Sequence, residues 1–167
     1  ASSYTSAILL SLSSYRYNCH SYAWYLHGDI NSQSPQLCFD DHSGFTHATP
    51  SCATQVYSPQ VGDIVTYTDP EDFDSLRAKH SAIITSVSAG TGVNQIVVAS
   101  KWGYYGVYSH ILSDCPYYTD AEHGTTHYLT NVKYYRLSHQ YILSGNDYYC
   151  KCCGYKNPTM VVSGVTK

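Results

Sequence analysis

Runs of β-branched and aromatic residues in the middle of the chain predict a series of short strands. Four of these runs have the length and composition of strands: 64–67, 81–87, 95–100 and 132–137. The turn-forming run 89–92 lies between the second and the third, so residues 80–100 are predicted to form a hairpin. Strands joined by such a short connection pair in an antiparallel sheet.

One stretch before the strands has the apolar spacing of a helix. Residues 19–27 carry apolar side chains at helical spacing, with Asn18 as the N-cap and Gly28-Asp29 at the C-terminal end. A helix followed by an antiparallel sheet predicts an α+β fold. Residues 29–58 show no sustained period and are expected to form a long loop.

The chain divides by composition into three parts. Residues 1–14 are Ser-rich with a small apolar group, and they are expected to form an arm, a strand or a short helix. Residues 15–138 contain the predicted helix and strands and form the main domain. Residues 139–167 form a cysteine-rich C-terminal tail.

Composition narrows the class of protein. With 167 residues, a net charge of −3 and 13% charged residues, the chain is expected to form one domain that does not bind nucleic acid. No apolar run approaches the length of about 20 residues that a membrane-spanning helix needs. Low charge and seven cysteines indicate a secreted protein in an oxidising environment. The start Ala1-Ser2-Ser3 would suit a chain from which a signal peptide has been cut.

The odd number of cysteines predicts one thiol outside the disulfides. Cys19 stands apart from the rest because it opens the predicted helix. The other six are disulfide candidates: Cys38, Cys52, Cys115, Cys150, Cys152 and Cys153. Cys38 and Cys52 form a plausible local pair, and Cys115 can pair with a tail cysteine. The full connectivity stays open, because spacing does not fix it.

Cys19 and His80 are the residues that indicate chemistry. At the first turn of a helix, a thiolate is stabilised by the helix dipole and by backbone N–H groups. A thiol nucleophile also needs a base, and His80 is the best placed of the nine histidines because it begins a β-branched strand. The next strand ends at Ser100 and can supply a group that orients the imidazole.

Several segments together resemble the papain-like amidases and endopeptidases of the CHAP and NlpC type. They are Tyr17-Asn18-Cys19-His20-Ser21-Tyr22-Ala23-Trp24, Gly62-Asp63-Ile64-Val65-Thr66-Tyr67 and the strand that His80 opens. The run Ser100-Lys101-Trp102-Gly103 is similar to secreted bacterial proteins of the same superfamily. The resemblance extends over residues 15–137.

This resemblance implies a papain-like α+β fold in which the cysteine-bearing helix packs on an antiparallel sheet. It implies a secreted amidase or endopeptidase that cuts peptide or amide bonds, in peptidoglycan above all, without a metal or cofactor. By resemblance, Cys19 is the nucleophile and His80 is the base. Relatives carry Asn, Glu, Gln or His as the third residue, whereas this chain offers Ser100.

The resemblance also indicates the surroundings of the nucleophile. The backbone N–H of Cys19 is one expected oxyanion donor, and Tyr17 or Asn18 would provide or shape the second. Trp102 is expected to form a wall of the substrate groove.

Two other interpretations remain open from the sequence. His139, Cys150 and Cys153 have the spacing of part of a zinc site, with Cys152 as a possible fourth ligand, but a second ligand pair is missing and disulfides are favoured in an oxidising compartment. Alternatively, 19 tyrosines and low charge suit a non-catalytic extracellular subunit that self-associates into a filament through its N-terminal strand. The tyrosines would also suit a sugar-binding face.

Overall fold

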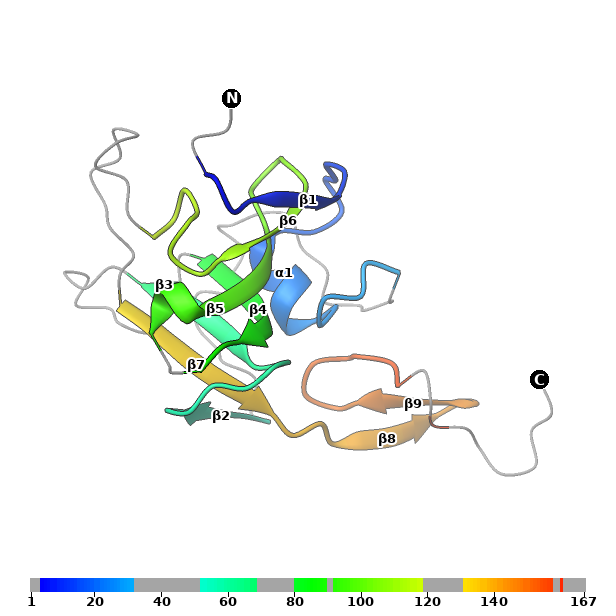
Figure 1. Cartoon of the computed structure of the whole chain (residues 1–167). Coiled ribbons are helices and arrows are strands. Elements are labelled where there is room, and N and C mark those ends of the chain that lie inside the picture. The colour runs from blue at the N-terminus through cyan, green and yellow to red at the C-terminus, as the bar shows by residue number, and fades with distance from the viewer. Residues whose placement is uncertain are drawn as a thin grey trace.

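The protein is an antiparallel sheet with one short helix on one face (Figure 1). The computed structural model describes residues 4–31, 52–68, 80–89, 92–118, 131–157 and 160, and every structural statement below refers to these. The elements are β1 (Ile8–Ser11), α1 (Cys19–Trp24), β2 (Ala53–Val56), β3 (Ile64–Thr68), β4 (His80–Val87), η2 (Val93–Gln95), β5 (Ile96–Lys101), β6 (Val107–Ile111), β7 (Asn131–Leu137), β8 (Tyr141–Ser144) and β9 (Asp147–Cys150).

Seven strands form the main sheet in the order β1-β6-β5-β4-β3-β7-β2, and each pairs antiparallel with its neighbours. The strands predicted from the four β-branched runs are present as β3, β4, β5 and β7. β4 and β5 pair as the predicted hairpin, with Ile83 opposite Ala99. The strands β8 and β9 form a separate two-stranded sheet near the C-terminus.

The predicted α+β, papain-like fold is wrong. The described part of the chain is mostly antiparallel sheet, and its single α-helix has six residues, which is too short to form a layer. The helix predicted over 19–27 ends at Trp24, since Tyr25 is the C-cap and both His27 and Gly28 have positive φ. The long loop expected at 29–58 contains β2, which pairs with β7.

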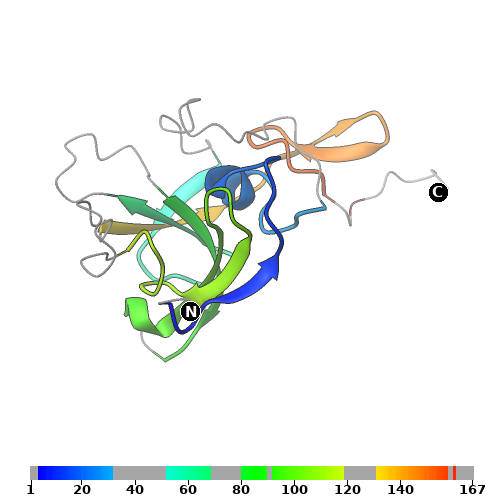
Figure 2. The same cartoon turned by 90° about the horizontal axis from the view of Figure 1, so that it is seen from above.

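The two faces of the sheet bury different residues. On one face, Trp24 and Ala23 of α1 pack against Ile64 of β3 and Ile83 of β4. On the other face, alternate residues of the same strands, such as Val65 and Ala82, join a larger core. This separation follows from the two-residue period of a strand, which sends neighbouring side chains to opposite faces. Figure 2 shows α1 lying against one side of the sheet.

The edge strand β1 exposes a run of apolar side chains. Ile8, Leu9, Leu10 and Leu12 are each at least half exposed.

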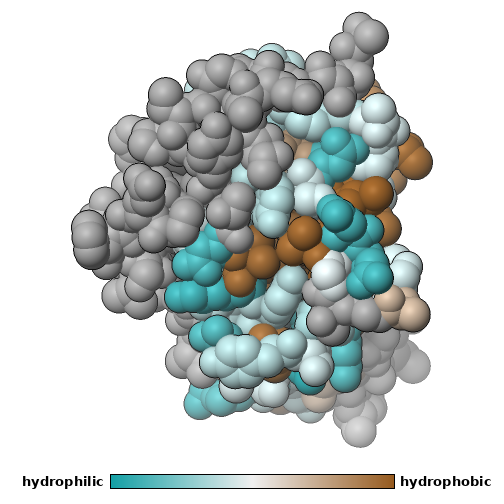
Figure 3. Space-filling view, turned by 60° about the vertical axis from the view of Figure 1, so that its left-hand side comes forward, coloured by the Kyte–Doolittle hydropathy of each residue, from teal (hydrophilic) through white to brown (hydrophobic). Residues whose placement is uncertain are grey.

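A side chain at Gly106 would overlap the carbonyl oxygen of Ser11, so glycine is needed where β1 meets β6. On the face drawn in Figure 3, apolar areas are small and separated by polar ones.

A disulfide ties the β8–β9 hairpin to the main sheet. Cys52, just before β2, bonds to Cys152, just after β9. A backbone hydrogen bond from Ser138 to the carbonyl of Cys52 lies at the same junction. No helix in the described ranges is long and apolar enough to cross a membrane.

Candidate functional site

Cys19 occupies the first position of α1, as predicted. The Asn18 side chain caps the helix by accepting a hydrogen bond from the backbone N–H of Ser21 at 2.8 Å. Cys19 is a buried thiol that forms no disulfide. The ammonium group of Lys101 lies 5.5 Å from the ring centroid of Tyr17, two residues before Cys19. Cys19 therefore lies at the capped start of α1.

His80 is completely buried as the first residue of β4. Its ring stacks on Tyr117 with centroids 3.8 Å apart, and the edge of Tyr67 lies 5.1 Å away. Neither ring nitrogen has a hydrogen-bond partner among the described residues. Burial, and then the neighbouring imidazoles of His20 and His110, hold the pKa of His80 well below its usual range. The ring is therefore neutral at pH 7.

The structure brings the first turn of α1 to the start of β4 but does not join Cys19 to His80. His20 Nδ1 lies 2.8 Å from Ser81 Oγ, and the indole N–H of Trp24 donates to the same oxygen at 3.2 Å. Ser81 thus faces α1, and His80, one residue earlier, projects from the opposite face. No hydrogen bond reaches the His80 imidazole from Cys19, given that both ring nitrogens lack a partner within the described part of the chain.

Ser100 orients a different histidine from the one expected. Its hydroxyl lies 2.8 Å from Nε2 of His110, and Trp102 donates its indole N–H to Ser100 at 3.0 Å. Nδ1 of His110 is 2.7 Å from the carbonyl oxygen of Ile111, so this nitrogen carries the proton and Nε2 accepts from Ser100. The prediction that Ser100 would orient His80 does not hold in this arrangement.

The chain uses the same three side-chain types twice. Trp24, Ser81 and His20 form one buried group, and Trp102, Ser100 and His110 form the other. Burial lowers the pKa of both His20 and His110 to about 4. Sequence reasoning did not find these groups, because Ser81 meets His20 and Trp24 only where α1 packs on β4, and Ser100 meets His110 only where β5 pairs with β6.

The residues expected around the nucleophile lie on two faces. Tyr17 and Asn18 adjoin Cys19, and the Tyr17 ring stacks on Tyr22 with centroids 6.2 Å apart. Trp102 belongs to the core on the other face, where it stacks on Tyr108 at 4.2 Å. Trp102 is therefore a core residue in this structure.

The disulfide pattern differs from the expected one. Cys52 bonds to Cys152, which excludes the local pair of Cys52 with Cys38, and Cys38 itself lies outside the described residues. Cys115, Cys150 and Cys153 are thiols. Burial raises the pKa of the Cys115 thiol to about 12, so this group is inert at neutral pH. Cys52 pairs with Cys152 because the fold brings β2 beside β9. The spacing of the cysteines along the chain does not reveal this proximity.

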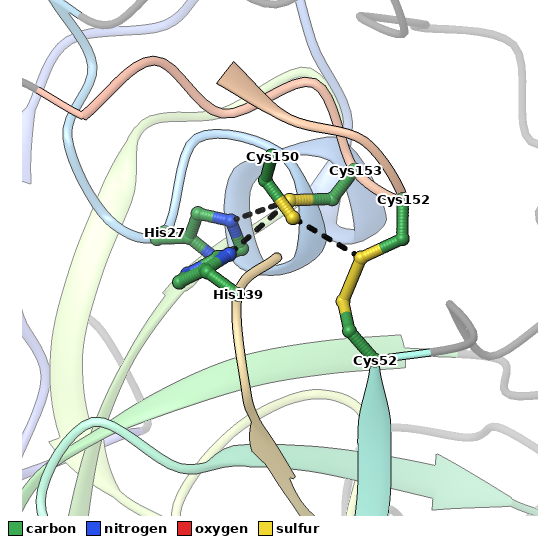
Figure 4. Close-up of a disulfide and its surroundings, with 6 residues drawn as sticks. All are labelled: His27, Cys52, His139, Cys150, Cys152 and Cys153. Carbon is green, nitrogen blue, oxygen red and sulfur yellow. Dashed lines mark hydrogen bonds between the residues drawn. A yellow bond between two sulfur atoms is a disulfide. The ribbon is translucent and has the colours of Figure 1, made fainter. Parts of the chain in front are cut away.

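A second cluster of chemically active side chains lies beside the disulfide (Figure 4). Cys153 Sγ lies 3.4 Å from His27 Nε2 and 3.6 Å from His139 Nδ1, and Cys150 Sγ lies 3.1 Å from Cys152 Sγ. The three ligand atoms of His27, His139 and Cys153 are mutually within 4.8 Å. Burial lowers the pKa of His27 to about 3 and also lowers that of His139, so both rings are neutral at pH 7.

Sequence analysis identified three members of this cluster, His139, Cys150 and Cys153, and missed His27. His27 directly follows the helical segment, more than a hundred residues before His139. The signal that could have found it is the His27-Gly28 pair, where a turn ends the helix. Cys152, considered as a fourth ligand, is instead in the disulfide.

No family model, curated protein or solved structure matches the chain.

Proposed function

We propose that the protein is a secreted cysteine hydrolase of peptide or amide bonds, with Cys19 as nucleophile and His80 as proton acceptor. Peptidoglycan is the proposed substrate class, because the segments around Cys19, Gly62-Asp63 and His80 resemble those of cell-wall amidases. The proposal keeps the chemistry implied by these segments and not the fold.

The observation that carries the proposal is the unsatisfied imidazole of His80. A neutral imidazole has one N–H donor and one acceptor nitrogen, and both are buried here without a partner. Each such group costs about 1–3 kcal/mol relative to a satisfied one. Among the described residues, no other buried side-chain nitrogen or oxygen is left without a partner. A buried polar group without a partner calls for an explanation, and a catalytic role is one such explanation.

The proposal requires a movement of His80. Its ring leaves the stack on Tyr117 and turns around the beginning of β4 toward the first turn of α1. His80 is the first residue of β4, where it pairs with Tyr67 of β3.

The reaction would proceed in two stages. Cys19 transfers its thiol proton to His80, and the thiolate attacks the amide carbonyl carbon. The carbon–nitrogen bond then breaks, and the amine leaves with the proton from His80. Water, activated by His80, attacks the resulting thioester and releases the acid and the Cys19 thiol. The backbone N–H of Cys19 is the proposed oxyanion donor.

The test is hydrolysis of purified peptidoglycan and of short stem peptides, followed by the new amino groups released and by the masses of the fragments. The wild type is expected to release amine, and Cys19→Ala to lower the rate by at least about 1,000-fold, as is usual for loss of a nucleophile. His80→Ala is expected to have a similar effect. Cys115→Ala is the matched control, because it removes a buried, inert thiol elsewhere.

Activity that survives in Cys19→Ala would contradict the proposal, as would the absence of any product from the wild type. The second outcome would favour the non-catalytic extracellular subunit instead. One observation supports that alternative: β1 is an edge strand with its apolar side chains exposed. Such an edge can pair with a strand of a neighbouring molecule.

A further inference from the structure

We propose that His27, His139, Cys150 and Cys153 bind a single structural zinc ion. The four residues come from three separate parts of the chain. His27 follows α1, His139 lies between β7 and β8, and the two cysteines end and follow β9. Nothing in this inference depends on the proposed hydrolysis.

The two sulfur–nitrogen distances at Cys153 fit tetrahedral coordination. Cys150 Sγ lies 3.1 Å from Cys152 Sγ and turns toward the ion to complete the site. With ordinary zinc–sulfur and zinc–nitrogen bonds, a sulfur and a nitrogen ligand lie about 3.5 Å apart in a tetrahedron. The distances from Cys153 Sγ to His27 Nε2 and to His139 Nδ1 are 3.4 and 3.6 Å. Figure 4 shows both imidazoles directed at Cys153, with Cys150 beside it.

The ligand set is typical of structural zinc. Two cysteines and two histidines with a two-residue spacer between the cysteines are a common combination. Four protein ligands leave no position for water, so the ion would have no hydrolytic role. The neighbouring sulfur group of Cys52, Cys150 and Cys152 does not offer a competing site, because two of its members are joined in the disulfide.

The surroundings hold the ligands in place. The His27 ring also hydrogen-bonds the backbone of Ala23, which fixes its orientation while Nε2 faces Cys153. Tyr155 packs edge-on against His27 at 4.7 Å and stacks on His139 at 5.5 Å. His27 has a φ of 50°, a conformation that a non-glycine residue adopts at a cost of about 1 kcal/mol. The hydrogen bond and the ring contacts preorganise the cluster.

A zinc ion here would fasten the β8–β9 hairpin to the end of α1, the helix that begins with Cys19. The disulfide fastens the same hairpin to β2 on its other side. Two crosslinks would then hold the hairpin in addition to its apolar packing, which matters because an isolated two-stranded sheet is only marginally stable.

The competing state is a disulfide between Cys150 and Cys153. The first step of the test is therefore peptide mapping of the full chain under non-reducing conditions. The site predicts that Cys52 and Cys152 are joined while Cys150 and Cys153 remain thiols. A Cys150–Cys153 disulfide in the protein as isolated would overturn the proposal.

The second step is metal binding by the full chain. Metal analysis is expected to find about one zinc ion per chain. Titration of the metal-free protein with Co²⁺ alone is expected to give a thiolate-to-cobalt charge-transfer band and the intense visible bands of a tetrahedral ion. His27→Ala and Cys153→Ser are expected to weaken Co²⁺ binding by more than about 100-fold. Cys115→Ser, which removes a thiol outside the cluster, is expected to bind as the wild type does.

The Co²⁺ spectrum of the wild type tests the proposed zinc site even if a ligand variant fails to fold. A Co²⁺ spectrum without thiolate charge transfer, or one that is octahedral, would overturn the proposal. Equal Co²⁺ affinity in the wild type and a folded His27→Ala variant would do the same, because it would remove His27 from the ligand set.

Discussion

Lowering the pH from 7 to 4 is expected to reduce the free energy of unfolding by about 3 kcal/mol for each of His20 and His110. Both imidazoles are buried, and burial lowers their pKa from the ordinary value of 6.5 to about 4. Above pH 6.5, both rings are neutral in the folded and unfolded states, so stability is at its full value. Between pH 6.5 and 4, the unfolded chain binds protons that the folded chain does not, and stability falls.

Urea unfolding at a series of pH values between 7 and 5 measures this effect. In that window, each histidine contributes a slope approaching about 1.4 kcal/mol per pH unit. His110→Gln and His20→Gln keep a polar side chain but remove the titration, so each variant is expected to lose its share of the slope. A stability that is flat from pH 7 to 5, or a slope that neither variant changes, would be inconsistent with buried neutral imidazoles.

Replacing Cys52 and Cys152 together by serine is expected to lower the free energy of unfolding by about 4–5 kcal/mol. The disulfide closes a loop with a sequence separation of 100 residues, and a crosslink of that length removes much conformational entropy from the unfolded chain. It also joins the β8–β9 hairpin to the start of β2. Unfolding in urea without reductant measures the difference.

A reducing agent provides the internal control for the disulfide. It is expected to destabilise the wild type by an amount similar to the double substitution and to leave the double variant unchanged. Cys115→Ser, a change at a buried thiol outside the disulfide, is expected to cost only about 1 kcal/mol. A wild type whose stability does not respond to reductant would show that Cys52 and Cys152 are not joined in solution.

The local elements were predictable where the sequence itself encodes them. The β-branched runs became β3, β4, β5 and β7, and Asn18 caps a helix that begins at Cys19. These signals are local: side-chain branching, turn residues and a capping side chain act on their own segment. The fold class was wrong because β1, β2 and β6 have weak patterns of their own and exist through pairing with other strands.

Contacts between distant segments also could not be predicted at the candidate site. The sequence pointed to Cys19 and His80, and their elements do lie against each other, yet the alternation of β4 sends His80 to the opposite face from α1. The side chains of a strand alternate between two faces, and packing decides which of the two sets faces a helix. A single amino-acid sequence does not specify that packing. For the same reason, Ser100 was assigned to the wrong histidine and His27 was not linked to Cys153.

The central claim, that Cys19 is a nucleophile activated by His80, is tested most directly by the pH dependence of its alkylation. Native protein is treated with iodoacetamide, and the modified cysteine is identified by peptide mass spectrometry. An ordinary thiol has a pKa near 8.5 and reacts slowly below that pH. The rate of Cys19 alkylation is expected instead to stay nearly constant as the pH falls below 8.5, down to the pKa of the Cys19–His80 pair. His80→Phe keeps an aromatic ring against Tyr117 and is expected to abolish this low-pH reactivity. A Cys19 that stays unmodified in the native protein, or that reacts with an ordinary thiol profile in both proteins, would contradict the claim.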